Sequence, residues 1–215
     1  MVPRMRNQTI ALFVPCVLAL GCGPTEPGHD DHDTEIISRV ELTFTPIAGG
    51  DPRVFAFSDP DGDGGVSGSA EPIVLALGET YSLRVAFLND LADPAVDITE
   101  EVEDEAEDHF VFVLGDGVAG PASPSSVSTA LVSHAYADLE SDYGANAIGD
   151  DLPLGIVSTI EATKAGTAGL RVVLRHLPEL NGTPQKTAGL PESLAAGEAL
   201  PGDVDVDVSF ELTIQ

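Results

Sequence analysis

Basic residues are scarce in this sequence, and their scarcity excludes a class of partners. Lysine and arginine together number nine against 36 aspartates and glutamates, and the formal net charge is −27 at pH 7. Such a chain is repelled by nucleic acid and by anionic lipid headgroups, so binding to either is not expected. Its natural counterparts are cations or a basic patch on a partner, although the charge also serves solubility in a salty environment.

Catalytic motifs are also missing. The sequence has no nucleophile elbow, phosphate-binding loop, zinc-protease helix or paired-cysteine motif. The run Gly115-Asp116-Gly117-Val118-Ala119-Gly120 spells the dinucleotide-binding fingerprint after a predicted strand. Prolines follow at positions 121 and 124, where a helix should begin, so we interpret the run as a turn. We therefore expect a protein that is not an enzyme.

Cysteine occurs only twice, and both residues lie near the N-terminus. A short basic region precedes an apolar run, residues 10–20, which is too short to span a bilayer, and Gly21 stands before Cys22. Residues 1–21 are therefore predicted to be an export signal. The run Ala19-Leu20-Gly21-Cys22 resembles a bacterial lipobox, whose cysteine is diacylated and becomes the new N-terminus. Cys16 does not compete, because Pro15 occupies the position that must be small.

The predicted lipidation of Cys22 places the protein in the bacterial cell envelope. The chain would be anchored through lipid, and Gly23 in place of Asp favours the outer membrane over the inner. The alternative is an ordinary signal peptide with a chance cysteine. Because Cys16 would leave with the signal and Cys22 would carry lipid, the mature chain forms no disulfide and depends on a hydrophobic core.

The mature chain divides into a tether and one domain. Residues 22–35 are rich in proline, glycine and acids and have no apolar period, which is typical of a flexible tether. Residues 36–215 have the length of a single domain, and no later apolar stretch is long enough for a transmembrane helix.

Within this domain, apolar residues mostly alternate with polar ones, which predicts strands with one buried face. Residues 97–108 break this period: Ile98, Val102 and Ala106 recur among acids, which indicates a short acidic helix that Thr99 could cap. The next run, His109–Leu114, is apolar on both faces and is expected to be a central strand. The predicted strands are the run around Val40–Phe44, Arg53–Ser58, 72–77, 81–87, His109–Leu114, 127–138, 156–163, 170–175 and 204–214.

These strands predict an all-β fold. We expect a Greek-key, immunoglobulin-like β-sandwich of about eight strands, with the acidic helix crossing between the sheets. Residues 139–153 and 181–202 are predicted to be long loops, the second with a helical turn at 191–196. The absence of a regular βαβ alternation argues against a doubly wound fold.

Three segments carry a resemblance to a family. They are residues 59–65 (DPDGDGG), residues 97–109 (DITEEVEDEAEDH) and residues 174–176 (LRH). Together they resemble a group of bacterial lipoproteins sometimes labelled "type 1 periplasmic binding fold superfamily", which carries no assigned activity. That label implies two doubly wound lobes, which this short, β-patterned chain does not support. By analogy, lipoproteins of this size often accompany TonB-dependent outer-membrane receptors, which makes such a receptor a candidate partner.

A calcium site is the first candidate for chemistry. Asp59, Asp61, Asp63 and Gly64 match positions 1, 3, 5 and 6 of a calcium-binding loop, in which alternating carboxylates surround a hard cation. The twelfth position, which should hold a bidentate glutamate, is Ala70, and the flanks are predicted strands. An irregular calcium turn and a polar hairpin loop are the alternatives here.

A zinc or copper site is the second candidate. Glu105 and His109 are spaced i, i+4 at the end of the acidic helix and would share a face. Alternation places His176 on the inner face of its strand with Leu170, Val172 and Leu174, and the resemblance keeps both histidines at matching positions. An imidazole with carboxylates can hold zinc or copper, whereas a lone inward histidine is usually a hydrogen-bonded core residue. The metal hypothesis predicts that the two imidazoles lie close together in the fold.

Three functional hypotheses follow from these patterns. The first is a non-enzymatic outer-membrane lipoprotein with a binding or accessory role beside a TonB-dependent receptor. The second is an envelope protein that handles calcium, zinc or copper. The third is a purely structural envelope protein.

Overall fold

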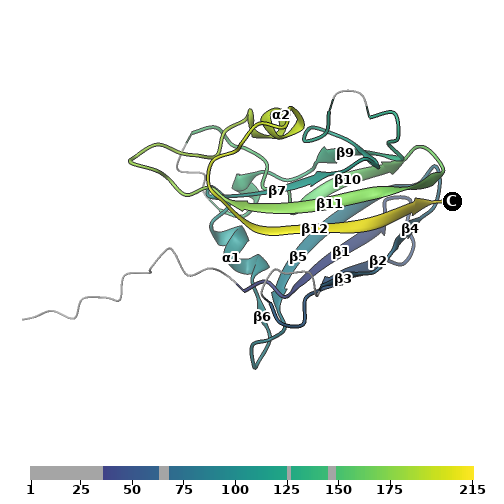
Figure 1. The fold of residues 1–215 in the computed structure, drawn as a ribbon, viewed down its shortest axis with the longest axis horizontal. Coiled ribbons are helices and arrows are strands. Elements are labelled where there is room, and N and C mark those ends of the chain that lie inside the picture. Colours follow the sequence, from purple (N-terminus) through teal and green to yellow (C-terminus); the bar gives the residue numbers. More distant parts are fainter. Residues whose placement is uncertain (1–35, 63–67, 125–126, 145–148) are drawn as a thin grey trace, which may run out of the picture. The chain divides into compact units, whose positions relative to one another are not determined.

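The computed structural model describes residues 36–62, 68–124, 127–144 and 149–215. The predicted export signal (residues 1–21), Cys22, the tether and Asp63 lie outside this part of the chain. The described part is mostly β-structure with two short α-helices, α1 (Thr99–Asp104) and α2 (Leu190–Ala195), and a 3-10 turn, η1 (Glu140–Asp142) (Figure 1). Among these residues, no helix has the length and apolar character needed to cross a bilayer.

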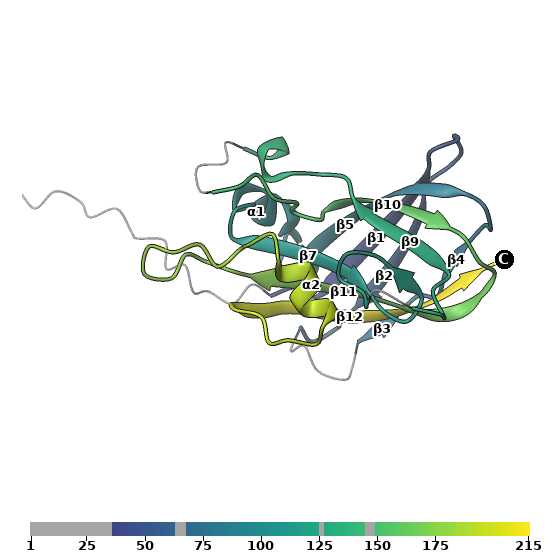
Figure 2. The same ribbon diagram turned by 90° about the horizontal axis from the view of Figure 1, so that it is seen from above.

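The strands form two sheets that curve around one core (Figure 2). The larger sheet has the order β3-β2-β1-β5-β10-β9-β8, with β6 beside β5, and the smaller has the order β4-β12-β11-β7. The strands of the larger sheet are β1 (Arg39–Pro46), β2 (Arg53–Ser58), β3 (Ser69–Ala70), β5 (Thr80–Asn89), β6 (Val96–Asp97), β8 (Val118–Ala119), β9 (Val132–Tyr136) and β10 (Val157–Ala162). Those of the smaller sheet are β4 (Ile73–Leu75), β7 (His109–Leu114), β11 (Gly166–His176) and β12 (Asp203–Ile214).

The all-β prediction is confirmed, but its details need correction. Every predicted strand is present, yet the described residues contain twelve strands, not about eight. The three strands that were not predicted, β3, β6 and β8, have two residues each, which is too few side chains to show an alternating pattern. The Greek-key, immunoglobulin-like order is not confirmed: β12 pairs with β4 and β9 with β8 in parallel.

Alternation explains the main core. One face of each long strand is buried, as in β5, where Tyr81, Leu83, Val85 and Phe87 are at most 1% exposed. Inward side chains of both sheets form one cluster, which also takes in Val102 of α1. Burial of each such side chain stabilises the fold by about 1.5–3 kcal/mol.

The strand β7 was predicted to be central, and this is wrong. It lies at the edge of the smaller sheet, beside β11 only. It is nevertheless buried on both faces, because Val111 and Val113 face the main core while Phe110 and Phe112 face a second cluster beneath α2. The free edge is covered by the 152–155 segment, where the Val111 N–H donates to the Leu154 carbonyl at 2.8 Å. The apolar pattern therefore reported burial and not position in the sheet.

The acidic helix crosses between the sheets as expected, from β6 to β7, but it is shorter than predicted. The α-helix ends at Asp104, and residues 105–108 form turns. Thr99 does not cap it: its hydroxyl is hydrogen-bonded to the backbone of Phe87 in β5, and the Asp97 carboxylate accepts the Thr99 N–H at 2.9 Å. The stripe of Ile98, Val102 and Ala106 is buried as predicted, which holds this segment against the core.

Candidate metal centre

Glu105, His109 and His176 come together where the turn after α1 meets the adjoining ends of β7 and β11. Each offers one ligand atom, and these atoms all lie within 4.8 Å of one another. Among the described residues, these three are the only set of three or more histidine, cysteine or carboxylate side chains that lie close enough to share a metal ion. The prediction that the two imidazoles lie close together is therefore confirmed.

Strand register explains the meeting of the two histidines. His109 begins β7, His176 ends β11, and the two are direct partners in the antiparallel pairing of these strands. Directly opposite residues on one face have Cβ atoms about 4.5–5.5 Å apart, which brings their side chains into contact. The rings stack with centroids 4.7 Å apart and planes 8° from parallel.

Glu105 reaches the same place by a different route from the one predicted. Helical geometry was expected to put it on a shared face with His109, but the helix has already ended at this point. The turn instead brings the Glu105 carbonyl oxygen 3.1 Å from His109 Nδ1, while a carboxylate oxygen of Glu105 lies 4.0 Å from the same nitrogen. The proximity was predicted correctly, and the reason for it was wrong.

The surroundings of His109 favour the form that binds metal. The side chain is 1% exposed, and burial, helped by neighbouring His176, lowers the pKa of His109 to about 4. The imidazole is therefore neutral near pH 7. With its Nδ1–H donated to the Glu105 carbonyl, the lone pair of Nε2 remains for a ligand, and histidines that bind metals usually donate their second ring nitrogen in this way.

Binding would need a small rearrangement. A tetrahedral zinc ion with bonds of about 2.0 Å places its ligand atoms about 3.3 Å apart. The lone pairs of imidazole lie in the ring plane, so two parallel rings cannot both point at one ion unless one of them turns. His176 is half-buried and Glu105 is exposed, so these two side chains have room to move toward the fixed ring of His109.

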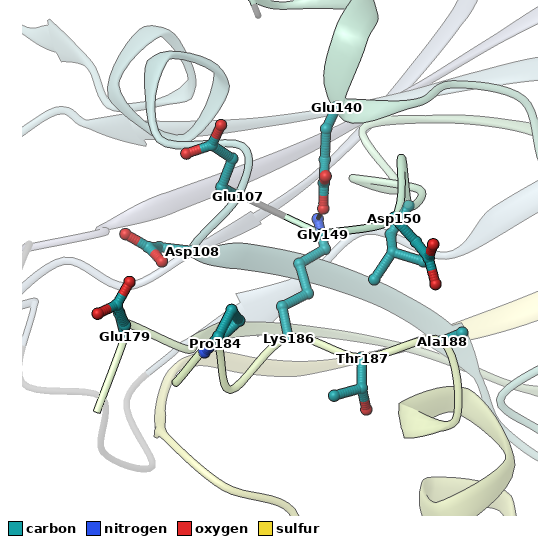
Figure 3. Close-up of a pocket in the computed structure, with 11 residues that line it drawn as sticks. Glu107, Asp108, Glu140, Gly149, Asp150, Glu179, Pro184, Lys186, Thr187 and Ala188 are labelled. Carbon is teal, nitrogen blue, oxygen red and sulfur yellow. Dashed lines mark ion pairs between the residues drawn. The ribbon is translucent and has the colours of Figure 1, made fainter. Parts of the chain in front are cut away.

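An acidic cavity of about 270 Å³ lies beside this centre. Glu107 and Asp108, which directly precede His109, line it together with Glu179 and Asp150 (Figure 3). Burial raises the pKa of Asp108, and the nearby His176 opposes this rise. The carboxylates on this side of the molecule create a negative potential that attracts cations toward the histidines.

Lys186 and Glu140 form an ion pair in the same cavity, and sequence reasoning missed both. Their side chains point toward each other and are 2% and 3% exposed, with Lys186 Nζ 2.7 Å from Glu140 Oε1 (Figure 3). The amine also donates to the Ala106 carbonyl at 2.7 Å and lies 5.1 Å above the Phe110 ring. Lys186 thus ties its own loop to the turn that carries Glu105. Nothing in its polar surroundings in the sequence signals a buried lysine.

The structure describes the calcium candidate only in part. Asp59 is 3% exposed, Asp61 is exposed, and Asp63 lies outside the described residues. The loop joins β2 to β3, which pair antiparallel, so its flanks are strands as predicted. The calcium hypothesis stays a prediction.

The glycine-rich run 115–120 is a turn, as interpreted from the sequence. It holds the two-residue strand β8, and its glycines permit close approach of backbone segments. A Cβ at Gly115, where φ is +121°, would lie 2.5 Å from the Gly169 carbonyl oxygen. These glycines therefore serve packing against β11.

Comparison of the chain with protein-family models, with curated proteins and with solved structures found no match.

Proposed function

We propose that this chain is a lipid-anchored protein of the bacterial cell envelope that binds a divalent transition metal ion, zinc or copper, through Glu105, His109 and His176. The observation that carries the proposal is the convergence of these three ligand groups within 4.8 Å. Glu105 and His109 come from the turn after α1 and the adjoining start of β7, whereas His176 comes from the distant end of β11, and His109 is buried in a neutral form. A solvated charge run would have neither feature.

The donor set indicates the class of ion. Two imidazoles and one carboxylate suit zinc and copper, whereas calcium and magnesium prefer sites made of oxygen ligands alone. Three protein ligands leave one position of a tetrahedral ion for water or for a group from a partner. Such a site suits a protein that holds an ion and passes it on, and the adjoining acidic cavity would draw cations to it.

The anchor and the partner belong to the same proposal. Lipid on Cys22 would hold the domain at the outer membrane through the tether of residues 22–35. A TonB-dependent receptor, which the family resemblance suggests as a neighbour, is the partner we propose for metal uptake. Co-purification of such a receptor with the membrane-bound protein would support this role, and a receptor-free preparation that retains full metal loading would argue against it.

Calorimetric titration with zinc and with copper tests the metal site. Because the strongly acidic surface attracts any cation, the titration is run at about 0.15 M salt, where the Debye length is about 8 Å, with excess calcium as competitor. We expect one ion per chain in the wild type. In Glu105→Gln and His176→Gln, the affinity should fall at least about 100-fold, since even residues that only support metal ligands contribute about 10- to 100-fold.

Glu101→Gln is the matched control. Glu101 is an exposed carboxylate in α1, four residues before Glu105, so its substitution makes the same change in net charge. Its affinity for zinc should equal that of the wild type. Equal losses in Glu101→Gln and Glu105→Gln, or complete displacement of zinc by calcium, would show that the ions are held by the general acidic surface and would refute the proposal.

A further inference from the structure

A second cavity, of about 470 Å³, lies between α2 and the loop that follows β7. Its walls are mainly apolar and include Leu114, Ala122, Val127, Leu194 and Ala195. The volume is in the range of about 300–1,000 Å³ that is common for small-molecule sites. None of its lining residues belongs to the proposed metal centre, so the two sites can be tested separately.

Ser123 supplies a polar group in this apolar setting. The residue lines the cavity and is 5% exposed, and its Oγ is buried with no hydrogen-bond partner among the described residues. Its own N–H donates to the Gly120 carbonyl at 3.1 Å, which fixes the backbone at this position in a turn. Since nearly all buried polar groups in native proteins are hydrogen-bonded, a hydroxyl in this state indicates an occupant that bonds to it.

Residues 116, 120 and 129, which flank the described part of the loop that carries Ser123, are attached to neighbouring strands or to each other. The Asp116 carboxylate accepts the Gly169 N–H at 2.6 Å, and the Thr129 hydroxyl donates to the Asp116 carbonyl at 2.7 Å. On the other side, Gly120 packs so closely on His134 that a Cβ there would lie 2.9 Å from Nδ1. These contacts attach the described parts of the cavity wall to both sheets, and a preformed site loses less conformational entropy on binding.

We propose that this cavity binds a small, neutral, mostly apolar molecule whose single hydroxyl or carbonyl group hydrogen-bonds to Ser123 Oγ. The apolar walls select the body of the ligand, and the buried hydroxyl selects one polar group. Neutral charge follows from the exposed Asp116 carboxylate at the rim and from the net charge of −27, both of which disfavour an anion.

The test is an NMR titration of the ¹⁵N-labelled protein with 1-hexanol, and with hexanoate as the anionic probe of equal chain length. We expect saturable shifts for the amides of Ser123, Leu194 and Ala195 with 1-hexanol, and at least about tenfold weaker binding of hexanoate. Ser123→Ala should weaken hexanol binding by about five- to tenfold, which corresponds to one hydrogen bond. Ala195→Leu, a half-buried site in α2, should abolish binding by filling the cavity.

Ser128→Ala is the matched control, because Ser128 lines the same cavity but is exposed. It should bind hexanol as the wild type does. A dispersed amide spectrum like that of the wild type, retained in all three variants, shows that they are folded. Equal hexanol affinity in Ser123→Ala and wild type would overturn the proposal, as would shifts that do not saturate or that lie away from α2. An ordered water on Ser123 without saturable hexanol binding would overturn it as well.

Discussion

The buried ion pair of Lys186 and Glu140 allows a sharp test of what holds the turn after α1 in place. Lys186→Met keeps most of the apolar stem that packs over Phe110 but removes the ammonium group. Glu140, 3% exposed, then loses its cation, and the Ala106 carbonyl loses the donor 2.7 Å away. Removal of one partner from a buried pair costs about 3–5 kcal/mol, because an uncompensated charge remains. We expect Lys186→Met to lower the free energy of unfolding by about 4 kcal/mol.

Urea unfolding followed by far-ultraviolet circular dichroism measures this change, which suits a chain without tryptophan. The double variant Lys186→Met/Glu140→Gln removes both charges and should be no less stable than Lys186→Met alone. Lys164→Met is the matched control: the other lysine of the chain is exposed, donates to the Ser128 carbonyl at 3.2 Å, and should change stability by no more than about 0.5 kcal/mol. Equal effects of Lys186→Met and Lys164→Met, or a double variant as costly as the sum of its single changes, would refute the reasoning.

Three further outcomes are expected. Burial lowers the pKa of His134 to about 4, whereas the unfolded residue titrates near 6.5. The contribution of neutral His134 to stability is therefore complete above pH 6.5 and declines by about 3 kcal/mol as the pH falls to about 4. In urea unfolding, metal-free His134→Gln should lack this part of the pH dependence. Gly202→Ala should destabilise the fold by more than about 2 kcal/mol, because a Cβ there would lie 2.0 Å from the His176 carbonyl oxygen. Gly197 has a similar positive φ but open space around it, so Gly197→Ala should cost only about 1 kcal/mol in the same assay. Cys22→Ser should abolish incorporation of labelled fatty acid in cells, and unchanged labelling would disprove the lipid anchor.

The fold class could be predicted because alternation is a local property. Strands such as β5 and β12 show their buried faces directly in the sequence. The bounds of β2 were also predicted correctly, and the continuous apolar run of β7 gave its exact bounds as well. The acidic helix and its buried stripe were also visible. The place of each strand in its sheet was not, since an apolar run such as His109–Leu114 reports that both faces are covered and not which elements cover them.

The metal centre shows the same division. The sequence offered Glu105, His109 and His176 as candidate ligands, because those residue types bind transition metals. Their convergence depends on the β7–β11 register and on a turn that ends the helix at Asp104, both of which are set by packing between distant segments.

The sequence by itself determined the alternating strands, the acidic charge, the single-domain length and the identity of the candidate ligands, all of which depend on residue type and short-range spacing. Only the tertiary structure decided that His109 stacks on His176, that Lys186 is buried against Glu140, and that Ser123 faces an apolar cavity. The two pairs are 67 (176 − 109) and 46 (186 − 140) positions apart, and the cavity lies between separate elements, so no local pattern encodes these contacts.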